Sequence, residues 1–311
     1  MVSLRSSQDS AKFMTRQATS RIRRRSLTEK YFPIILITPA VAITLFLVIF
    51  PLIWALGLSF YDYNVIRGGV MRFVGLDNYA RLLSSRTIWK RFVTTAEFVV
   101  SAVLLEFLIG FGLAFLFYQQ FRGRRLAMAL VTMPMLIAPV ATGLFFRYIF
   151  DATHGVVTYF LYLITGKHIK LLSEHAMLSC VIVDVWQWSP FMMLFILAGL
   201  EAVPRHLLES AEIDRFSWFT KFRVVIWPTI RPLVMLALLF RTMDALRTFD
   251  TVYILTEGGP GTRTELISLH LYRLAFSFFR TGEACALAFI LLVLVILLTN
   301  LYLRMARRVG V

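Results

Sequence analysis

Residues 209–232 read ESAEIDRFSWFTKFRVVIWPTIRP and form a polar, partly charged stretch between two long apolar runs. Pro204 precedes this stretch, and a proline is tolerated in the first turn of a helix because no N–H donor is needed there. Apolar side chains then alternate with acidic ones, including Glu209 and Asp214. This pattern predicts a short amphipathic helix over about 205–216 that faces water between two membrane spans.

The composition of the whole chain is that of a membrane protein. Of its 311 residues, 58% are hydrophobic and 16% are charged, and the mean hydropathy is +0.72. A soluble domain carries about 25% charged residues, so we expect an integral membrane protein. The net charge of +15 would also suit a nucleic-acid-binding protein. However, the positive side chains stand beside apolar runs, which predicts contact with membrane lipid and none with nucleic acid.

Six apolar runs are long enough to cross a bilayer as helices, which takes about 20 residues each. They cover about 34–60, 92–120, 127–150, 176–198, 232–252 and 283–303. The first run contains Pro39 and Pro51, which can bend it. The predicted fold class is therefore an all-α membrane protein with six transmembrane helices.

The distribution of Lys and Arg predicts the orientation of the chain. These residues are more frequent on the side of the N-terminus than on the other side, although the basic segment 81–91 weakens the difference. By the positive-inside rule both termini are cytoplasmic. We expect a basic cytoplasmic tail at 1–30, a transmembrane domain at 31–305 and a cytoplasmic tail at 306–311. The first apolar run starts too late and is too long for a cleavable signal peptide.

The stretch from Glu209 to Pro232 resembles the EAA loop in permease subunits of binding-protein-dependent ABC importers. Glu209, Ala211, Asp214, Pro228 and Pro232 stand at the spacing of that loop. The resemblance implies the type I ABC importer permease fold. It also implies that the predicted helix docks into a cleft on a separate ATPase subunit and couples ATP hydrolysis to transport.

The residues expected to make this coupling contact are Glu209, Ser210, Ala211, Asp214 and Arg215. The two small side chains let another surface approach closely, and the two carboxylates can pair with Lys or Arg of a partner. The family usually has glycine where Arg215 stands, which suggests either a helix that continues or a changed contact with the ATPase. A helix that only lies on the membrane surface is the alternative, but acidic side chains suit an anionic leaflet poorly.

Three further stretches resemble the carbohydrate-uptake branch of the same family, of the maltose and glycerol-phosphate type. They are FVGLDNY at 73–79, WQWSPF at 186–191 followed by LAGL at 197–200, and FDTVYILTEGGPG at 249–261. In all, the resemblance covers about 31–305. The Gly-Gly-Pro form is similar to that of the larger maltose permease subunit, without the extra spans and large outer domain of that subunit.

The expected function is that of a transport subunit and not of an enzyme. The sequence contains no Walker A pattern, so the chain should not bind ATP. We also expect this chain to bind no metal ion and no other cofactor. The resemblance implies two copies of a cytoplasmic ATPase that hold ATP and Mg²⁺, a second related permease chain, and a periplasmic or lipid-anchored solute-binding protein. It implies alternating access in the bacterial inner membrane, with a sugar or sugar derivative as substrate.

Charged side chains inside spans cost roughly 2.5–3.5 kcal/mol on insertion scales and tend to face a cavity or one another. Those in or at the rim of the predicted spans are Glu97, Glu106, Arg147, Asp184, Arg241, Asp244, Arg247 and Asp250. The residues chosen as candidates for the substrate pathway are Arg147, Trp186, Gln187, Asp244 and Arg247. Trp186 and Gln187 combine an aromatic face with an amide, and the surplus of arginine hints at an anionic sugar.

Other roles for these residues stay open. Arg247 stands three residues from both Asp244 and Asp250, so these charges can instead neutralise one another along one helix face. Trp186 can instead anchor the chain at the membrane interface or pack between helices.

Two other classes of protein remain as alternatives. An ion-coupled secondary transporter would show more spans and internal repeats, and the 209–232 stretch would have no explanation. A polytopic membrane enzyme, such as a lipid-linked glycosyltransferase, would need clustered carboxylates or histidines with metal-ligand spacing. The five histidines are scattered along the sequence, mostly in predicted loops.

Overall fold

The computed structural model describes residues 27–64, 66 and 68–308. Most of the predicted N-terminal tail and the last three residues of the predicted C-terminal tail lie outside the described residues. The chain divides into two compact units, Met1–Ala55 and Leu56–Val311, and each is described by itself.

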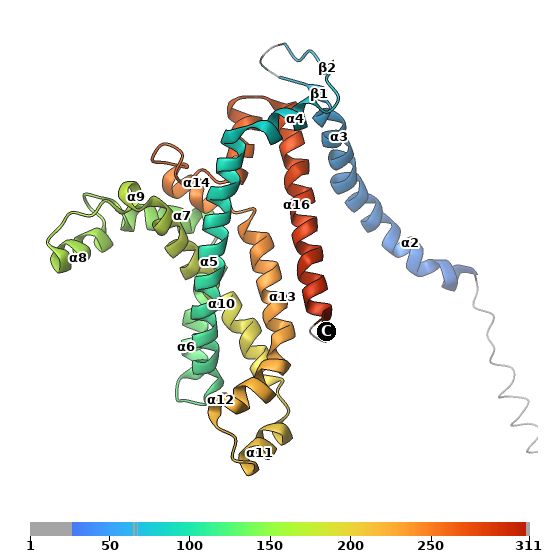
Figure 1. Cartoon of the computed structure of the whole chain (residues 1–311). Helices are drawn as coiled ribbons and strands as arrows, with labels where there is room; N and C mark the ends of the chain where they lie inside the picture. Colours follow the sequence, from blue (N-terminus) through green and yellow to red (C-terminus); the bar gives the residue numbers. More distant parts are fainter. Residues whose placement is uncertain (1–26, 65, 67, 309–311) are drawn as a thin grey trace, which may run out of the picture. The chain divides into compact units, whose positions relative to one another are not determined.

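The first unit contains an apolar helix with a widened turn. It comprises α2 (Leu27–Thr44), the π-helical segment η1 (Leu45–Ile49) and the start of α3 (Phe50–Ser59), which crosses into the second unit (Figure 1). The π turn ends two residues before Pro51. A proline has no N–H donor and its ring crowds the carbonyl four residues earlier, so a wider turn accommodates it. The apolar stretch Leu36–Ser59 agrees with the first predicted span.

The second unit continues from α3 into a small hairpin and a short helix. The two strands β1 (Tyr61–Asp62) and β2 (Arg72–Phe73) pair in antiparallel register, and α4 (Asp77–Ser84) follows. The buried side-chain amide of Asn78 donates to two backbone carbonyls, one at the end of α3 and one in β1, at 2.8 and 2.9 Å. Asn78 thereby satisfies a carbonyl that the end of α3 leaves without a partner and ties α4 to β1.

Four long helices form the body of this unit: α5 (Arg86–Tyr118), α10 (Ala176–Glu201), α13 (Trp227–Ala245) and α16 (Thr281–Arg308) (Figure 1). The central helix is α10, which packs against both α5 and α13. A Cβ added at Gly110 would come within 2.5 Å of a side chain of α10, so this close crossing requires glycine. Fully buried side chains in this core include Phe98, Val183, Met192, Met193 and Ile196.

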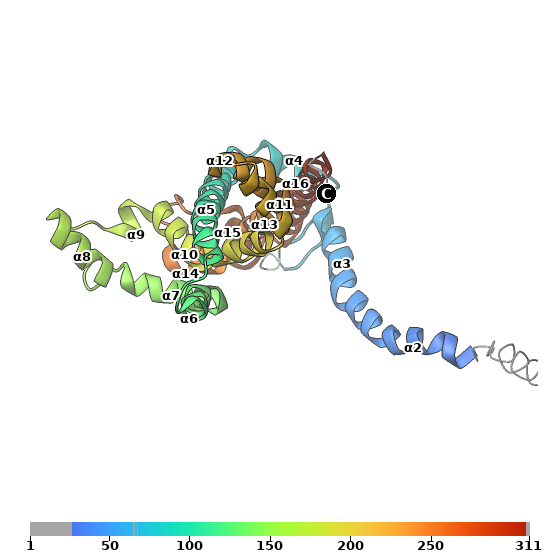
Figure 2. The same ribbon diagram turned by 90° about the horizontal axis from the view of Figure 1, so that it is seen from below.

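The third predicted span, 127–150, is not one straight helix. It consists of α6 (Arg124–Thr132), the 3₁₀ segment η2 (Met133–Leu136) and α7 (Pro139–Ile149), and the two halves are bent by 98°. Pro139 opens α7 and biases the residue before it towards an extended backbone, which interrupts the helix. Beyond α7, the short helices α8 (Val156–Thr165) and α9 (Leu171–Glu174) extend to one side of the long helices (Figures 1 and 2).

The fifth predicted span, 232–252, is displaced along the sequence. The helix begins with α12 (Trp218–Lys221), widens into the π segment η3 (Phe222–Ile226) and continues as α13. As in the first unit, the π turn ends two residues before a proline, here Pro228. After α13 the chain turns and forms a separate short helix, α14 (Asp250–Thr256). Both prolines 228 and 232 are accommodated inside this helix and do not precede it.

The remaining elements lie at the two ends of the long helices. The short helix α11 (Arg205–Ile213) lies with α12 at one end, and α4 and the strands lie at the other (Figure 1). The helix α15 (Ile267–Tyr272) and the π segment η4 (Arg273–Ser277) precede α16. Within the described part of the chain, five helices are long and apolar enough to cross a membrane, or six when the bent pair is taken as one span.

Candidate functional site

The helix α11 ends in a tight turn that contains a left-handed residue. Arg215 has φ of +53°, its N–H donates to the carbonyl of Glu212 at 3.0 Å, and the N–H of Phe216 donates to the carbonyl of Ala211 at 2.9 Å. These two bonds form a Schellman turn, which commonly closes a helix on glycine. The helix ends at Ile213, so the suggestion of a helix that continues past Arg215 is wrong, and the turn forms without glycine.

The five residues expected to contact an ATPase fall into two groups. The exposed ones are Glu209, Ser210, Asp214 and Arg215. The side chain of Ala211 is only 3% exposed, because it packs against its own chain. The small side chain at this position therefore lets α11 lie close to the rest of the protein, and the four exposed residues of the predicted set supply two carboxylates and one guanidinium.

Apolar side chains also stand on the outer face of α11. Ile213 is 82% exposed, and Leu207 is 41% exposed. The ammonium group of Lys221 binds the carboxylate of Glu212 at 2.6 Å and fixes α11 to α12. The surface of α11 therefore offers both ionic partners and an apolar contact on a support that is tied to the fifth span.

Replacing Arg215 with glycine should stabilise the turn after α11. A non-glycine residue in the left-handed region costs about 1–2 kcal/mol, and glycine loses part of this gain through its greater freedom when unfolded. We expect amide hydrogen exchange over residues 205–216 to slow by roughly threefold to fivefold, about 0.5–1 kcal/mol. The matched control is Arg223→Gly, which places glycine in a helical segment and should speed local exchange. Equal effects of the two variants would contradict this account of the turn.

A buried group of charges joins three of the long helices. The side chain of Arg241 on α13 is 1% exposed, and its Nε lies 2.7 Å from a carboxylate oxygen of Glu106 on α5. Its Nη2 pairs with Asp184 on α10, and its Nη1 lies 3.2 Å from Asp244 on the next turn of α13. Asp244 thus pairs with Arg241, and the alternative pairing of Asp244 with Arg247 does not form in the structure.

Two cavities lie beside this buried group. The larger, of about 400 Å³, is lined by Trp188, Phe191, Phe195, Phe240, Arg241, Asp244 and Arg247. The smaller, of about 140 Å³, is lined by Pro139, Asp184, Trp188, Asp244, Arg247, Thr248, Phe249, Asp250 and Thr251. The guanidinium carbon of Arg241 lies 5.3 Å from the ring centre of Trp188, at cation–π distance. The cavities share Trp188, Asp244 and Arg247, so we treat them as one candidate ligand site.

The chemistry of this site suits a polyhydroxylated ligand. Aromatic rings from α10 and α13 provide apolar faces, and carboxylates and a guanidinium provide acceptors and donors that fix orientation. Asp244 is half exposed although it pairs with Arg241, so its carboxylate can still accept a further hydrogen bond. The Nε of Arg247 donates to the carbonyl of Met243 at 3.2 Å, which leaves its terminal nitrogens for other partners.

The structure places only two of the five predicted pathway residues at the candidate ligand site. Asp244 and Arg247 lie together at the site, whereas Trp186, Gln187 and Arg147 lie elsewhere. Successive residues of an α-helix are about 100° apart around its axis, so Trp186 and Gln187 point away from the face of α10 that carries Trp188. Trp188 is not among the residues predicted to line a pathway, and the structure places it beside Asp244 and Arg247.

Gln187 stabilises the bend in the third span. Its side chain is buried, and its Nε2 donates to the carbonyl of Ile137 at 2.8 Å. Ile137 lies between η2 and α7, where the interrupted helix leaves carbonyl groups without intrahelical partners. The amide of Gln187 therefore supplies a hydrogen bond that the bend requires.

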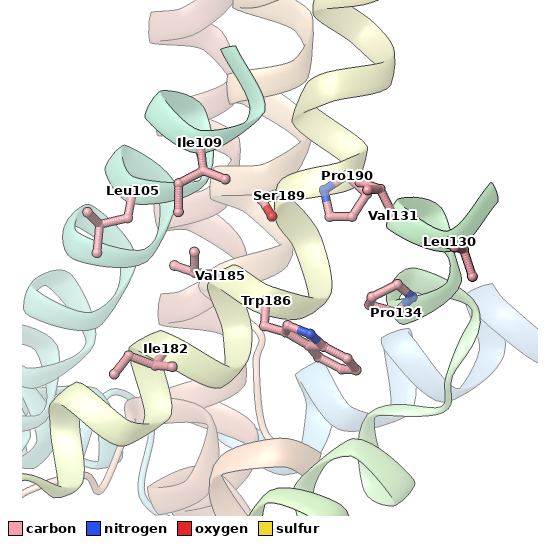
Figure 3. A pocket seen from close by; sticks show the side chains of 10 residues that line it. All are labelled: Leu105, Ile109, Leu130, Val131, Pro134, Ile182, Val185, Trp186, Ser189 and Pro190. Carbon is pink, nitrogen blue, oxygen red and sulfur yellow. The ribbon is translucent and has the colours of Figure 1, made fainter. Parts of the chain in front are cut away.

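Trp186 faces a different, largely apolar cavity. This cavity has a volume of about 520 Å³ and lies between α5, α10 and the segment formed by α6 and η2 (Figure 3). Trp186 also packs edge-on against Phe146 of α7, with ring centres 5.0 Å apart. Apart from the Trp186 indole, Ser189 contributes the only polar side chain among the residues that line this cavity. The surroundings of Trp186 thus favour helix packing.

Arg147 connects α7 to α14. Its Nη1 donates to the carbonyl of Ile254 at 3.0 Å and lies 3.3 Å from a carboxylate oxygen of Glu257. Arg273 also donates to the backbone carbonyl of Glu257, at 2.6 Å. These contacts hold the end of α14 and the following Gly-Gly-Pro segment between α7 and η4.

Another buried carboxylate, that of Glu265, lies between α14 and α15, outside the spans. Glu265 is 3% exposed and contacts Arg91 at 2.8 Å, His270 Nδ1 at 3.0 Å and Arg273 at 3.1 Å. Burial alone would raise the pKa of Glu265, but the hydrogen bond with His270 and the charges of Arg91 and Arg273 lower it below its ordinary value of 4.5. The ionised carboxylate ties this segment to the start of α5.

Several residues that line the cavities were not among the residues predicted to line a pathway. They include Asp184, Trp188, Arg241 and Asp250. The available signal was the presence of charges inside apolar runs. The sequence could not show that Glu106, Asp184 and Arg241, which stand far apart along the chain, meet at one point.

Comparison with known proteins agrees with this architecture. Residues 106–311 match the family described as the binding-protein-dependent transport system inner membrane component. The trehalose/maltose transport permease MalF of Thermococcus litoralis is 33% identical over 300 residues, covering 94% of this chain and 99% of that protein. The trehalose transport permease SugA of Mycobacterium tuberculosis is 30% identical over 280 residues, covering 90% of each. The sulfoquinovosyl glycerol permease SmoG of Agrobacterium fabrum is 29% identical over 283 residues, covering 90% and 92%.

The fold is also that of a solved importer. A chain of a bacterial ABC transporter involved in the import of the acidic polysaccharide alginate superposes with a TM-score of 0.78 at 20% identity, covering 91% of this chain and 98% of that chain. The predicted all-α permease fold is therefore confirmed. The chain belongs to the family of binding-protein-dependent transport system inner membrane components and is a multi-pass permease subunit of an ABC importer.

Proposed function

We propose that this chain forms one half of the path by which an ATP-driven importer moves a sugar or sugar derivative across the bacterial inner membrane by alternating access. The observation that carries the proposal is the pairing of a mostly exposed, acidic α11 with an aromatic and charged cavity in the same bundle. Relatives that transport trehalose and maltose support a sugar as substrate. Family membership favours this reading over an ion-coupled transporter or a membrane enzyme.

The helix α11 is the proposed contact with a cytoplasmic ATPase. The carboxylates of Glu209 and Asp214 would pair with basic side chains of that partner, and Ile213 would bury apolar surface. Lys221 connects α11 to α12, which runs into the fifth span, so a displacement of α11 would move that span. In this arrangement both termini and α11 lie in the cytoplasm.

The proposed importer contains three further kinds of subunit. A chain without a Walker A pattern needs ATPase subunits that hold ATP and Mg²⁺, and two copies would serve two permease chains. A second, related permease chain would complete the pathway opposite Asp244 and Arg247. A periplasmic or lipid-anchored binding protein would deliver the sugar.

The test is to purify the tagged chain with its co-expressed partners and to measure uptake in liposomes. We expect an ATPase to co-purify in stoichiometric amount, and we expect uptake of radiolabelled trehalose, delivered by the binding protein, to require ATP. The control is an ATPase partner whose P-loop lysine is replaced. Uptake driven by an ion gradient without ATP would contradict the proposal.

A further inference from the structure

The charges at the candidate ligand site do not balance. Asp184, Asp244 and Asp250 line the two cavities, together with Arg241 and Arg247. A site built to hold an acidic ligand would present guanidinium groups that lack carboxylate neighbours. Here each arginine has carboxylates close to it, in space or in sequence.

The charge of Arg241 is already neutralised within the protein. Its guanidinium contacts Glu106, Asp184 and Asp244, and it stacks over Trp188. Glu106 and Asp184 are buried with it. Little of the positive charge of Arg241 is therefore available to a ligand in the cavity.

Arg247 is the other guanidinium that lines the cavities, and it stands between acidic neighbours. Asp244 lies three residues before it and Asp250 three residues after it, and both side chains are exposed towards the same cavity. With Glu106 included, four carboxylates accompany two guanidiniums around this site. Carboxylates still outnumber guanidiniums when one buried carboxylate holds a proton, so the charged side chains around the cavity are net negative.

On the basis of the proposed pathway, we infer that this site selects a neutral or amino-bearing polyhydroxylated compound and disfavours a sugar with a carboxylate or sulfonate group. Asp244 and Asp250 are the side chains that determine this selectivity. Their oxygens accept hydrogen bonds from hydroxyl or ammonium groups of the ligand, and they repel an anion inside a cavity with low-dielectric walls. This differs from the anionic sugar suggested by the number of arginines in the sequence.

The inference can be tested without knowing the transported compound. Thr248 lines the smaller cavity, and Thr248→Cys would place a thiol there. We compare the rates at which this thiol reacts with two methanethiosulfonate reagents, one that carries a trimethylammonium group and one that carries a sulfonate group. The rates are measured in the assembled complex, with and without ATP and vanadate. Their ratio is divided by the ratio for a small free thiol. The parent chain, whose Cys180 is buried and Cys285 half-buried, gives the background.

We expect the ratio of the cationic rate to the anionic rate to be roughly tenfold higher at this thiol than at the free thiol. Asp244→Asn or Asp250→Asn should each reduce that preference several-fold. The control Asp77→Asn, which changes an exposed carboxylate on α4, should leave the preference unchanged. A ratio equal to or below that of the free thiol would overturn the inference, and so would a thiol that reacts with neither reagent. ATP-driven uptake is measured separately, so the proposed function can fail while the charge preference stands.

Discussion

Replacing Arg241 with methionine should leave little folded protein in a detergent extract. The change removes the guanidinium that neutralises Glu106 and Asp184, both of which are buried between α5, α10 and α13. Breaking a buried ion pair by removing one partner costs about 3–5 kcal/mol, a large part of the roughly 5–15 kcal/mol that stabilises a typical protein. The measurement is the yield of monodisperse protein and its thermal unfolding temperature in the same detergent.

Two companion variants separate charge from packing. Arg241→Met combined with Glu106→Gln and Asp184→Asn removes the uncompensated charges and should recover most of the lost stability. Asp244→Asn removes the half-exposed partner and should cost less than about 1 kcal/mol. A single Arg241→Met variant as stable as the parent chain would show that the buried group does not hold the three helices together.

The positions of most spans could be predicted from the sequence because apolar length alone decides them. The stretches around 34–60, 92–120, 176–198 and 283–303 all became helices of similar extent. The fifth span is displaced because the predicted apolar run, 232–252, begins only at Pro232. In the structure the π segment η3 absorbs Pro228, and the helix begins fourteen residues before Pro232, at Trp218.

The bend in the third span could not be predicted from its hydropathy. Both halves are apolar, and Pro139 shows only where a break can occur. The angle of 98° depends on partners far away in the sequence, such as Gln187, which binds the carbonyl of Ile137, and Arg147, which binds α14. Such contacts between helices have no local sequence signal.

The candidate ligand site likewise depends on contacts between helices that the sequence alone does not predict. The charges inside the apolar runs are visible in the sequence, and Asp244 and Arg247, which stand three residues apart, line the same cavities in the structure. Their partners across the bundle are not visible in the sequence, because Arg241 and Arg247 each stand three residues from Asp244 and are equally good partners by spacing. Only the positions of Glu106 and Asp184 on other helices decide that Arg241 points inward and Arg247 towards the cavity.

Replacing Glu209 with lysine should abolish ATP-driven uptake and leave the protein folded. Glu209 is exposed on α11, and substitutions at such positions usually change stability by less than about 0.5 kcal/mol. In the proposed contact, however, a lysine would face basic side chains of the ATPase, and like charges across an interface cost several kcal/mol. We expect more than a tenfold loss of uptake and a reduced amount of co-purified ATPase. Uptake in liposomes and the unfolding temperature of the permease are measured on the same preparation.

The matched control is Glu174→Lys, which makes the same charge change at an exposed carboxylate on α9, away from α11 (Figure 1). This variant should transport as the parent chain does, because α9 has no place in the ATPase contact. Glu209→Gln should fall between the two, since it removes the attraction without adding repulsion. Parental uptake by Glu209→Lys would refute the role of α11, and equal losses in both lysine variants would assign the effect to net charge. Loss confined to Glu209→Lys, with unchanged unfolding, is the result that only a coupling contact at α11 explains.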